Sequence, residues 1–284
     1  MVENPGMETH IHPFQLYQAR DKKLTPFYLH SSPEFHMKNL LASSEEFQNI
    51  FTINYCFRDE PTSPIHRPQF LMLEWYRKNA FYTEIMDDVE GLIKYIQKNL
   101  DTKNKIEKFQ RVTIQDLIQE KSGFDILNFL DKKDLKEKIQ KDFKEVPLPD
   151  AECAWDDYYF LFFLNIIEPL LINYPYLLLY EFPAPLSALS TLKPENPKVC
   201  ERFEVYLKGI ELCNCFNELT DFEEQKKRFE FQANEKKELY GYELPWPEEF
   251  MQTLKTGYPR SSGIALGIER LLYSMFDIQN PFFK

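Results

Sequence analysis

Residues 50–77 read IFTINYCFRDEPTSPIHRPQFLMLEWYR, two alternating segments joined by a loop with three prolines. Such alternation is typical of β-strands, in which successive side chains point to opposite faces of a sheet. One face of the predicted hairpin carries Arg58, Glu60, Phe70, Glu74 and Tyr76. The other face is apolar, so we expect it to pack against helices. A charged, aromatic face backed by a core predicts the floor of a ligand site.

The residue types on this face suit a nucleotide. The guanidinium group of Arg58 is planar and permanently charged, which suits a phosphate, and Phe70 offers a flat ring on which a base can stack. Glu60 can accept a hydrogen bond from an exocyclic amine. Glu74 and Tyr76, further along the same face, can hold a cation. The alternative, from these residues alone, is an amphipathic hairpin with a hydrated charged face.

Four stretches, in this order, resemble class II aminoacyl-tRNA synthetases of the lysine type, and most closely the elongation factor P lysine ligases. They are SSPEFHMKNLL (31–41), FRDE with HRPQFLMLEWY (57–76), ERFEVYLKGIELCNCFNELTD (201–221) and SSGIALGIERLL (261–272). The resemblance implies an α+β fold, the class II catalytic core, with an antiparallel β-sheet flanked by helices. We expect a single domain over residues 1–284, without an anticodon-binding domain. The lysine- and acid-rich residues 101–150 lie outside these recognised stretches, and they predict a helical insertion.

The resemblance also implies an activity. The chain would use ATP and Mg²⁺ to activate lysine or (R)-β-lysine as an aminoacyl-adenylate and transfer it to a lysine side chain of elongation factor P. We expect a cytoplasmic homodimer without tight tRNA binding, because a net charge of −11 is unfavourable for contact with nucleic acid. Two alternatives stay open. One is a lysine-activating enzyme with another acceptor, either tRNA or a small amine, and the other is a catalytically silent regulatory paralogue.

Individual roles follow from the same resemblance. Arg58 and Arg270 would be the catalytic residues, neutralising the α- and γ-phosphates. The ATP-binding residues would be Arg58, Asp59, Glu60, His66, Arg67, Phe70, Glu204, Val205, Gly267 and Arg270. The amino-acid-binding residues would be Ser32, Pro33, Glu34, Glu74, Tyr76, Glu211, Asn214, Glu218 and Ala265. Glu204 and Glu211 would hold Mg²⁺, which takes oxygen ligands, provided that a register shift near Gly209 places both on one face.

Two of the stretches contain helix-start signals. Ser32 and Pro33 precede an apolar-periodic run, and we expect them at the N-cap and at the first helical position. In the last stretch, Ile264 and Leu266 are expected to face the core, with small residues on the other face. Arg270 would then lie in the first turn of the helix that follows, where phosphate binds readily. The buried face of that helix is predicted to contain Ile268, Leu271, Leu272 and Met275. A further amphipathic helix is predicted over 84–100.

The sequence departs from the family pattern at several positions. Cys215 stands where the family usually has glycine, and it would crowd the pocket. In the loop of the hairpin, Arg67 replaces an asparagine and Gln69 a glutamate, which changes the charge near the nucleotide. VENPGM at 2–7 resembles only the tail of motif one. We expect either a start inside the true gene product or the loss of part of the usual dimer interface.

Two further observations exclude other classes of protein. The five cysteines form no CxxC pair, which predicts reduced thiols rather than a zinc or disulfide framework. The amino terminus has no apolar core of a signal peptide. The most apolar stretch, 158–182, is interrupted by prolines and polar residues, and it predicts a buried helix followed by an extended segment rather than a membrane span.

Overall fold

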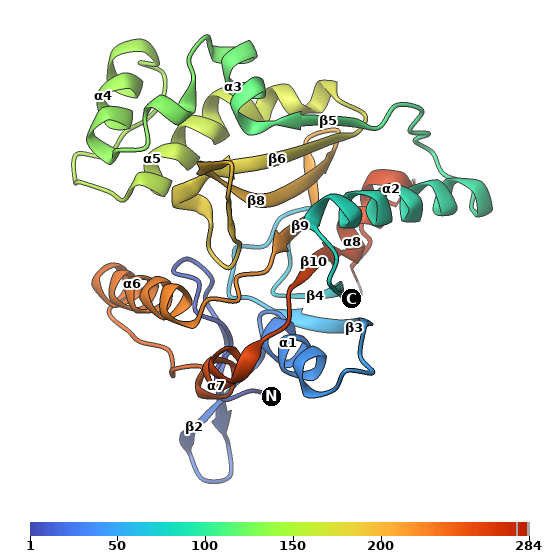
Figure 1. Cartoon of the computed structure of the whole chain (residues 1–284), viewed down its shortest axis with the longest axis vertical. Helices are drawn as coiled ribbons and strands as arrows, with labels where there is room; N and C mark the ends of the chain where they lie inside the picture. Colours follow the sequence, from blue (N-terminus) through green and yellow to red (C-terminus); the bar gives the residue numbers. More distant parts are fainter. Residues whose placement is uncertain (277, 283–284) are drawn as a thin grey trace. The chain divides into compact units, whose positions relative to one another are not determined.

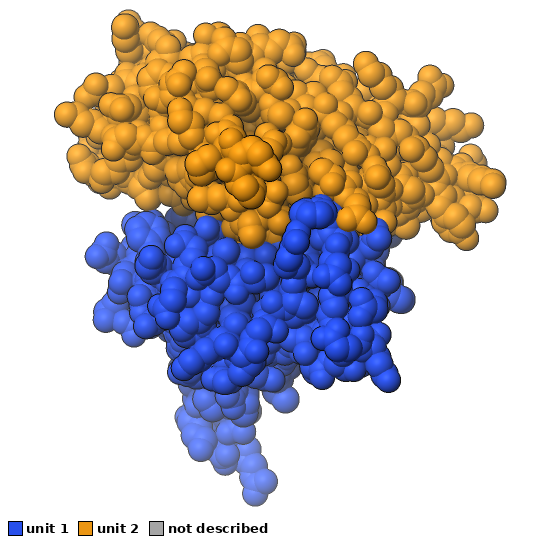
Figure 2. All heavy atoms as spheres, in the orientation of Figure 1, with its two compact units in different colours: residues 1–81, 218–284 blue, residues 82–217 orange. Residues whose placement is uncertain are grey.

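The computed structural model describes residues 1–276 and 278–282. It divides into two compact units (Figure 2). Unit 1 combines residues 1–81 with 218–284, and unit 2 consists of residues 82–217. Whether these units form the single catalytic domain expected from the sequence stays a prediction.

Unit 1 is built on the predicted hairpin. β3 (Asn49–Phe57) pairs with β4 (Gln69–Lys78), and β10 (Ser261–Gly267) pairs with the other edge of β4, all antiparallel (Figure 1). α1 (Glu34–Ser43) packs against β3 and β4, while α8 (Ile268–Met275) packs against β4 and β10. The remaining elements are β1 (Gln15–Gln18), β2 (Lys23–Tyr28), α6 (Phe222–Tyr240) and α7 (Glu248–Gly257).

The hairpin is confirmed, but its buried face is the opposite of the one we expected. Glu74 and Tyr76 are 0% and 3% exposed, whereas Phe51 and Ile53 on the apolar face of β3 are 73% and 53% exposed. The reason is local: Ser32, just before α1, hydrogen-bonds Glu74. The start of α1 therefore lies against the polar face, whose side chains satisfy one another.

β10, which begins the fourth sequence stretch (261–272), is oriented as predicted. Ile264 and Leu266 of β10 are 2% and 0% exposed. On the other face the ring of Tyr76 lies over Gly263, and a Cβ atom at Gly263 would come within 2.1 Å of that ring. No side chain fits there, so glycine is required for the close packing of β10 on β4.

The helix that follows β10 buries a different set of side chains from the one predicted. Leu271 and Met275 are buried as expected, but Ile268 and Leu272 are only partly buried. Glu269, 4% exposed, takes part in the buried face instead. Its two carboxylate oxygens accept the backbone N–H of Leu71 at 2.8 and 3.0 Å, which ties α8 to β4 and satisfies the buried charge.

Unit 2 is also built on strands. β6 (Leu177–Pro183) pairs with β8 (Asn196–Leu207), and β8 pairs with β9 (Ile210–Asn217), both antiparallel. β5 (Gln110–Thr113) adds to β6 in parallel, and β7 (Leu192–Lys193) pairs with β8. The helices of unit 2 are α2 (Tyr82–Asn99), α3 (Ile114–Ser122), α4 (Lys132–Asp142) and α5 (Trp155–Phe162). α2 packs on β8 and β9, and α3 on β5 and β6.

The helix and strand predictions for unit 2 are largely confirmed. α2 covers the predicted helix, and residues 101–150 hold α3 and α4 beside the short β5. The apolar stretch 158–182 runs from α5 through a π-helical turn and a 3₁₀ turn that contains Pro169, and then enters β6. Among the described residues, no helix has both the length and the apolar character needed to cross a bilayer.

Candidate active site

Ser32 joins the start of α1 to the hairpin. Its hydroxyl group accepts the Glu34 N–H at 3.0 Å and donates to Glu74 Oε1 at 2.5 Å. The helix begins at Glu34, one residue later than predicted, with Pro33 as the residue before it, yet Ser32 still satisfies a free N–H of the first turn. The Tyr76 hydroxyl donates to the second oxygen of Glu74 at 3.2 Å. Both oxygens of this carboxylate are therefore held in place.

Lys38, which the sequence interpretation missed, lies at the centre of this group. Its Nζ atom is 2.6 Å from Glu34 Oε1 and 2.6 Å from Glu218 Oε2, and its side chain is 1% exposed. Glu34 and Lys38 are four residues apart on α1, a spacing that can be read from the sequence and that brings helical side chains together. The pair with Glu218, from the far end of the chain, has no signal in the sequence.

Glu34 and Glu218 thus share one lysine, and Glu34 is close enough to Glu74 to repel its carboxylate. Burial raises the pKa of Glu74 to about 8, and repulsion by Glu34 adds to this, while hydrogen bonds from Ser32 and Tyr76 oppose it. Burial lowers the pKa of Lys38, but the attraction of Glu218 and Glu34 outweighs burial, so the net direction is upward and the lysine stays charged. The group has more acid than base and is suited to receive a further cation.

The predicted phosphate-binding arginines lie on the hairpin and on α8. The Arg58 guanidinium is 5.4 Å from the centroid of the Phe70 ring and donates to the Ser31 carbonyl at 3.4 Å. Among the described residues it forms no ion pair with a carboxylate. Its charge is therefore available to an anion, and the Phe70 ring lies next to it.

Arg270 and His66, both predicted to bind ATP, are in contact. Arg270 Nη2 is 2.6 Å from His66 Nε2, and His66 Nδ1 is 3.0 Å from the Ser63 hydroxyl. Because arginine can only donate, Nε2 accepts and the proton of the neutral imidazole is on Nδ1. Arg270 lies in the first turn of α8, where free N–H groups and the helix dipole favour anions.

The other residues of unit 1 that are predicted to bind ATP or the amino acid differ in how well their positions suit that role. Asp59 and Glu60 follow Arg58 in the loop after β3, and Asp59 is exposed. Ala265 lies opposite Glu74 in the β10–β4 register, and Gly267 precedes α8. Arg67 donates to the carbonyl groups of its own loop at Ser63 and His66 and lies over the Phe282 ring. Its position gives no support to an ATP contact.

In unit 2 the β8–β9 hairpin contains the register shift that the sequence required. The turn uses Lys208 and Gly209, both with positive φ. Val205 pairs with Cys213 and Tyr206 with Glu211, which leaves Leu212 as an extra residue. Glu211 contributes, after burial, to the raised pKa of Glu204. The two carboxylates are therefore close enough to repel each other, an arrangement that favours a cation.

Arg202 is a second residue that the sequence interpretation missed. It pairs with Glu204 at 2.5 Å and donates to Asn214 Oδ1 at 3.0 Å, and the Tyr206 hydroxyl donates to the other Glu204 oxygen at 2.5 Å. Each Glu204 oxygen retains a lone pair beyond these bonds. Glu204 and Glu211 are thus compatible with a Mg²⁺ ion, because it takes carboxylate ligands and keeps several waters.

One prediction about this hairpin is wrong, and the prediction for Val205 is limited to its backbone. Cys215 pairs with Phe203, and both are 0% exposed, so Cys215 points to the face opposite Glu204 and Asn214. It cannot crowd a pocket on the Glu204 face. Val205 lies on the same core face as Cys215 and is also 0% exposed, so its side chain does not reach a nucleotide.

Comparison with known proteins identifies the family. The model for tRNA synthetases class II (D, K and N) matches residues 2–280. The chain therefore belongs to the class II tRNA synthetase family and is an ATP-dependent ligase with the predicted α+β fold.

More particularly, the chain is similar to proteins named elongation factor P–(R)-β-lysine ligase. The one from Pectobacterium atrosepticum is 38% identical over 249 residues, which cover 86% of this chain and 72% of the relative. Those from Yersinia enterocolitica and Proteus mirabilis are 37% and 35% identical, each over 95% of this chain and 82% of the relative. The resemblance seen in the four sequence stretches is confirmed.

Proposed function

We propose that this chain activates lysine or (R)-β-lysine with ATP and transfers it to a lysine side chain of elongation factor P. The observation that carries the proposal is the pairing of Lys38 with Glu34 and Glu218 and the nearness of Glu74 to Glu34, because this excess of carboxyl groups suits a substrate with two ammonium groups. The names of the relatives support the choice of amino acid and acceptor.

The proposed chemistry has two steps. In the first, a carboxylate oxygen of the amino acid attacks the α-phosphorus of ATP, and the bond to pyrophosphate breaks. Arg58 would neutralise the α-phosphate and Arg270 the γ-phosphate, with Glu60 and Phe70 holding the adenine. Such a step depends on positioning and on charge neutralisation more than on an acid or base.

In the second step, the neutral amine of the acceptor attacks the acyl carbon of the adenylate. A C–N bond forms, AMP leaves with the electrons of the C–O bond, and the amine loses a proton. Glu204 and Glu211 would hold the Mg²⁺ that accompanies ATP, with Asn214 beside them. A homodimer is part of the same proposal, and sedimentation velocity of the purified chain tests it directly.

The proposed function is tested by amino-acid-dependent exchange of labelled pyrophosphate into ATP. We expect exchange with lysine or β-lysine in the presence of Mg²⁺, and none with leucine or arginine. Adding elongation factor P should then give a mass increase of one lysyl or β-lysyl group on the factor. Lysine exchange followed by transfer to lysine tRNA instead would show that the acceptor is wrong, and a chain inactive with every cationic amino acid would be a silent paralogue.

We also expect the affinity for free lysine to rise with pH between about 6 and 8. Glu74 has a pKa of about 8 in the unliganded protein, and an ammonium group beside it lowers that pKa, so binding must expel a proton below pH 8. The dissociation constant should fall by up to about tenfold per pH unit and level off above pH 8. Calorimetry in buffers of different ionisation enthalpy measures the released proton. In Glu74→Gln the pH dependence should weaken, and what remains is assigned to Glu218, whose pKa burial also raises to about 8. A wild-type protein without proton release would contradict the assignment.

A further inference from the structure

A cavity of about 530 Å³ lies in unit 1 beside the amino-terminal segment. Its walls come from residues 1–8, from the start of α1 and from residues 245–250. It shares Ser32 and Glu34 with the predicted amino-acid-binding residues. Glu74, Tyr76, Glu218 and Ala265 do not line it. The cavity is therefore a neighbour of the predicted amino-acid pocket rather than the pocket itself.

The lining of this cavity combines acids with aromatic rings. No lysine or arginine lines it within the part of the chain that the structure describes. Its carboxylates are those of Glu3, Glu8, Glu34, Glu248 and Glu249, and its rings are those of Phe27, Phe35, Trp246 and Phe250, together with the imidazole of His36. An apolar wall with carboxylates suits a ligand that has a methylene stem and a cationic head.

Glu8 is an acid of the wall whose carboxylate is held by the backbone beside it. Its carboxylate accepts the Met7 N–H at 3.1 Å, and a Cβ atom at Gly6 would lie 2.7 Å from one of its oxygens. Glycine therefore leaves the space that the carboxylate occupies. Burial raises the pKa of Glu8, and repulsion by Glu34 adds to this, while backbone hydrogen bonds and the attraction of Arg58 oppose it. Two acids that repel each other at a cavity wall are stabilised by a cation between them.

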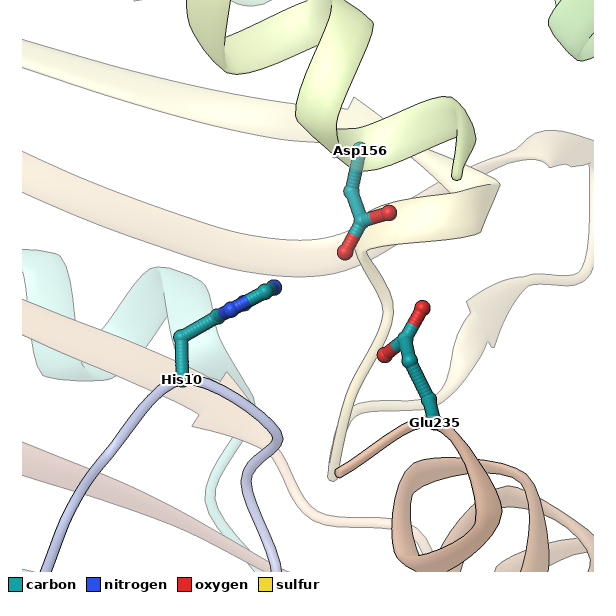
Figure 3. A group of neighbouring side chains, drawn as sticks. All are labelled: His10, Asp156 and Glu235. Atoms are coloured by element: carbon teal, nitrogen blue, oxygen red, sulfur yellow. The ribbon is translucent and has the colours of Figure 1, made fainter. Parts of the chain in front are cut away.

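The segment that carries Glu8 is fixed to α6 behind it. Lys236 donates to the carbonyl oxygens of Glu8, Thr9 and Ile11 at 3.1, 2.7 and 2.8 Å. The Thr9 hydroxyl donates to Glu235 at 2.6 Å, and a His10 ring nitrogen lies within 4.8 Å of a Glu235 oxygen (Figure 3). These bonds hold the backbone of Glu8 in place, so its carboxylate is presented to the cavity without rearrangement.

A second observation is independent of the acids. Asn39 on α1 also lines the cavity, and its Oδ1 atom is buried without a hydrogen-bond partner among the described residues. A buried carbonyl oxygen without a donor is costly. An ammonium group has three N–H donors and can serve this oxygen together with a carboxylate.

We propose that this cavity binds the alkylammonium side chain of the acceptor lysine, with Glu8 as its counter-ion and the aromatic rings around its methylene groups. The inference rests on the proposed function, which requires two amines: that of the amino acid, for which Glu74 and Glu218 are available, and that of the acceptor. The cavity shares only Ser32 and Glu34 with the predicted amino-acid-binding residues. It is therefore next to the amino-acid pocket but separate from it, as a site for the acceptor amine must be.

The test separates the two amines by measuring the two half-reactions of Glu8→Gln. The lost charge-assisted contact should raise the KM for elongation factor P about tenfold or more, while the KM for lysine in pyrophosphate exchange changes by less than about twofold. At saturating lysine, which keeps it out of the amino-acid pocket, n-butylammonium should still inhibit transfer competitively with elongation factor P. The matched control is Glu46→Gln, which removes the same charge from an exposed turn outside the cavity and should change neither KM.

Other results overturn the inference. If Glu8→Gln raises the KM for lysine in exchange as much as that for the factor, the cavity belongs to the amino acid. If neither constant changes, it binds no substrate amine. Should the wild-type protein show no exchange, the proposed function fails by itself. Calorimetry of n-butylammonium binding to wild type and Glu8→Gln then still decides whether the cavity holds an alkylammonium group, and equal heats would reject it.

Discussion

Replacing Arg270 by alanine is expected to lower lysine-dependent pyrophosphate exchange by about 30- to 1,000-fold. A guanidinium aimed at transition-state phosphate charge in a partly enclosed site contributes roughly 2–4 kcal/mol. Arg270 is placed for this role in the first turn of α8, where its Nη2 contacts His66. The contact with His66 is to an imidazole nitrogen, which does not by itself neutralise the guanidinium charge. Steady-state exchange at saturating lysine and varied ATP measures the loss.

The matched control for this substitution is Arg260→Ala. Arg260 is an exposed arginine just before β10, with its guanidinium over the Phe81 ring at 4.8 Å. Its removal should leave exchange within about twofold of wild type, because single rim charges contribute little. Both variants should melt close to the wild-type temperature. Near-wild-type exchange in Arg270→Ala would place Arg270 away from the phosphates.

The hairpin shows what alternation can and cannot predict. The period of two between residues 50 and 77 located both strands, since it reflects the pleat of the backbone. It did not predict which face is buried, because that depends on what packs against the hairpin. Here the hydrogen bonds from Ser32 and Tyr76 to Glu74 satisfy the polar face and allow its burial, while Phe51 stays exposed.

The register of β8 and β9 could be predicted because it was constrained. Glu204 and Glu211 can share a face only if one strand has an extra residue, and the structure has it at Leu212. The same register explains the wrong prediction for Cys215. Its neighbours in sequence belong to the site, but alternation turns its own side chain toward Phe203 and the core.

The residues that the sequence did not reveal are the buried cations. Lys38 and Arg202 each contact carboxylate or amide partners that the fold brings together. A sequence motif identifies the acids of a site but not the charge that balances them. That balance depends on tertiary packing, and here it decides how many cations the group around Lys38 can still accept.

Replacing Lys38 by methionine is expected to lower the free energy of unfolding by about 3–5 kcal/mol near pH 8, since it leaves buried carboxylates without their partner. Methionine keeps most of the side-chain volume, so packing changes little. The two carboxylates involved are those of Glu34 and Glu218, each 2.6 Å from Nζ. Urea unfolding monitored by tryptophan fluorescence measures the change.

The pH dependence distinguishes lost charge from lost packing. In wild type the net upward shift of the Lys38 pKa means that its stabilisation is fully present below the ordinary lysine pKa and is lost only in strong alkali. In the variant, Glu218 loses the attraction of Lys38 that opposes the effect of burial, so its folded-state pKa rises further, and the penalty appears as pH rises. The free energy of unfolding of Lys38→Met should therefore be only slightly below that of wild type at pH 5 and far below it at pH 8.

Lys78→Met provides the control within the same unit. Lys78 is also a buried lysine, but the carboxylate it contacts, that of Glu45, is 95% exposed and stays hydrated when the lysine is gone. Replacing Lys78 by methionine should lower the free energy of unfolding by about 1 kcal/mol or less, and this loss should change little between pH 5 and pH 8. If Lys38→Met and Lys78→Met cost the same at both pH values, the carboxylates around Lys38 do not depend on it for their charge. The excess of acid that we assign to the lysine-binding group would then have no basis.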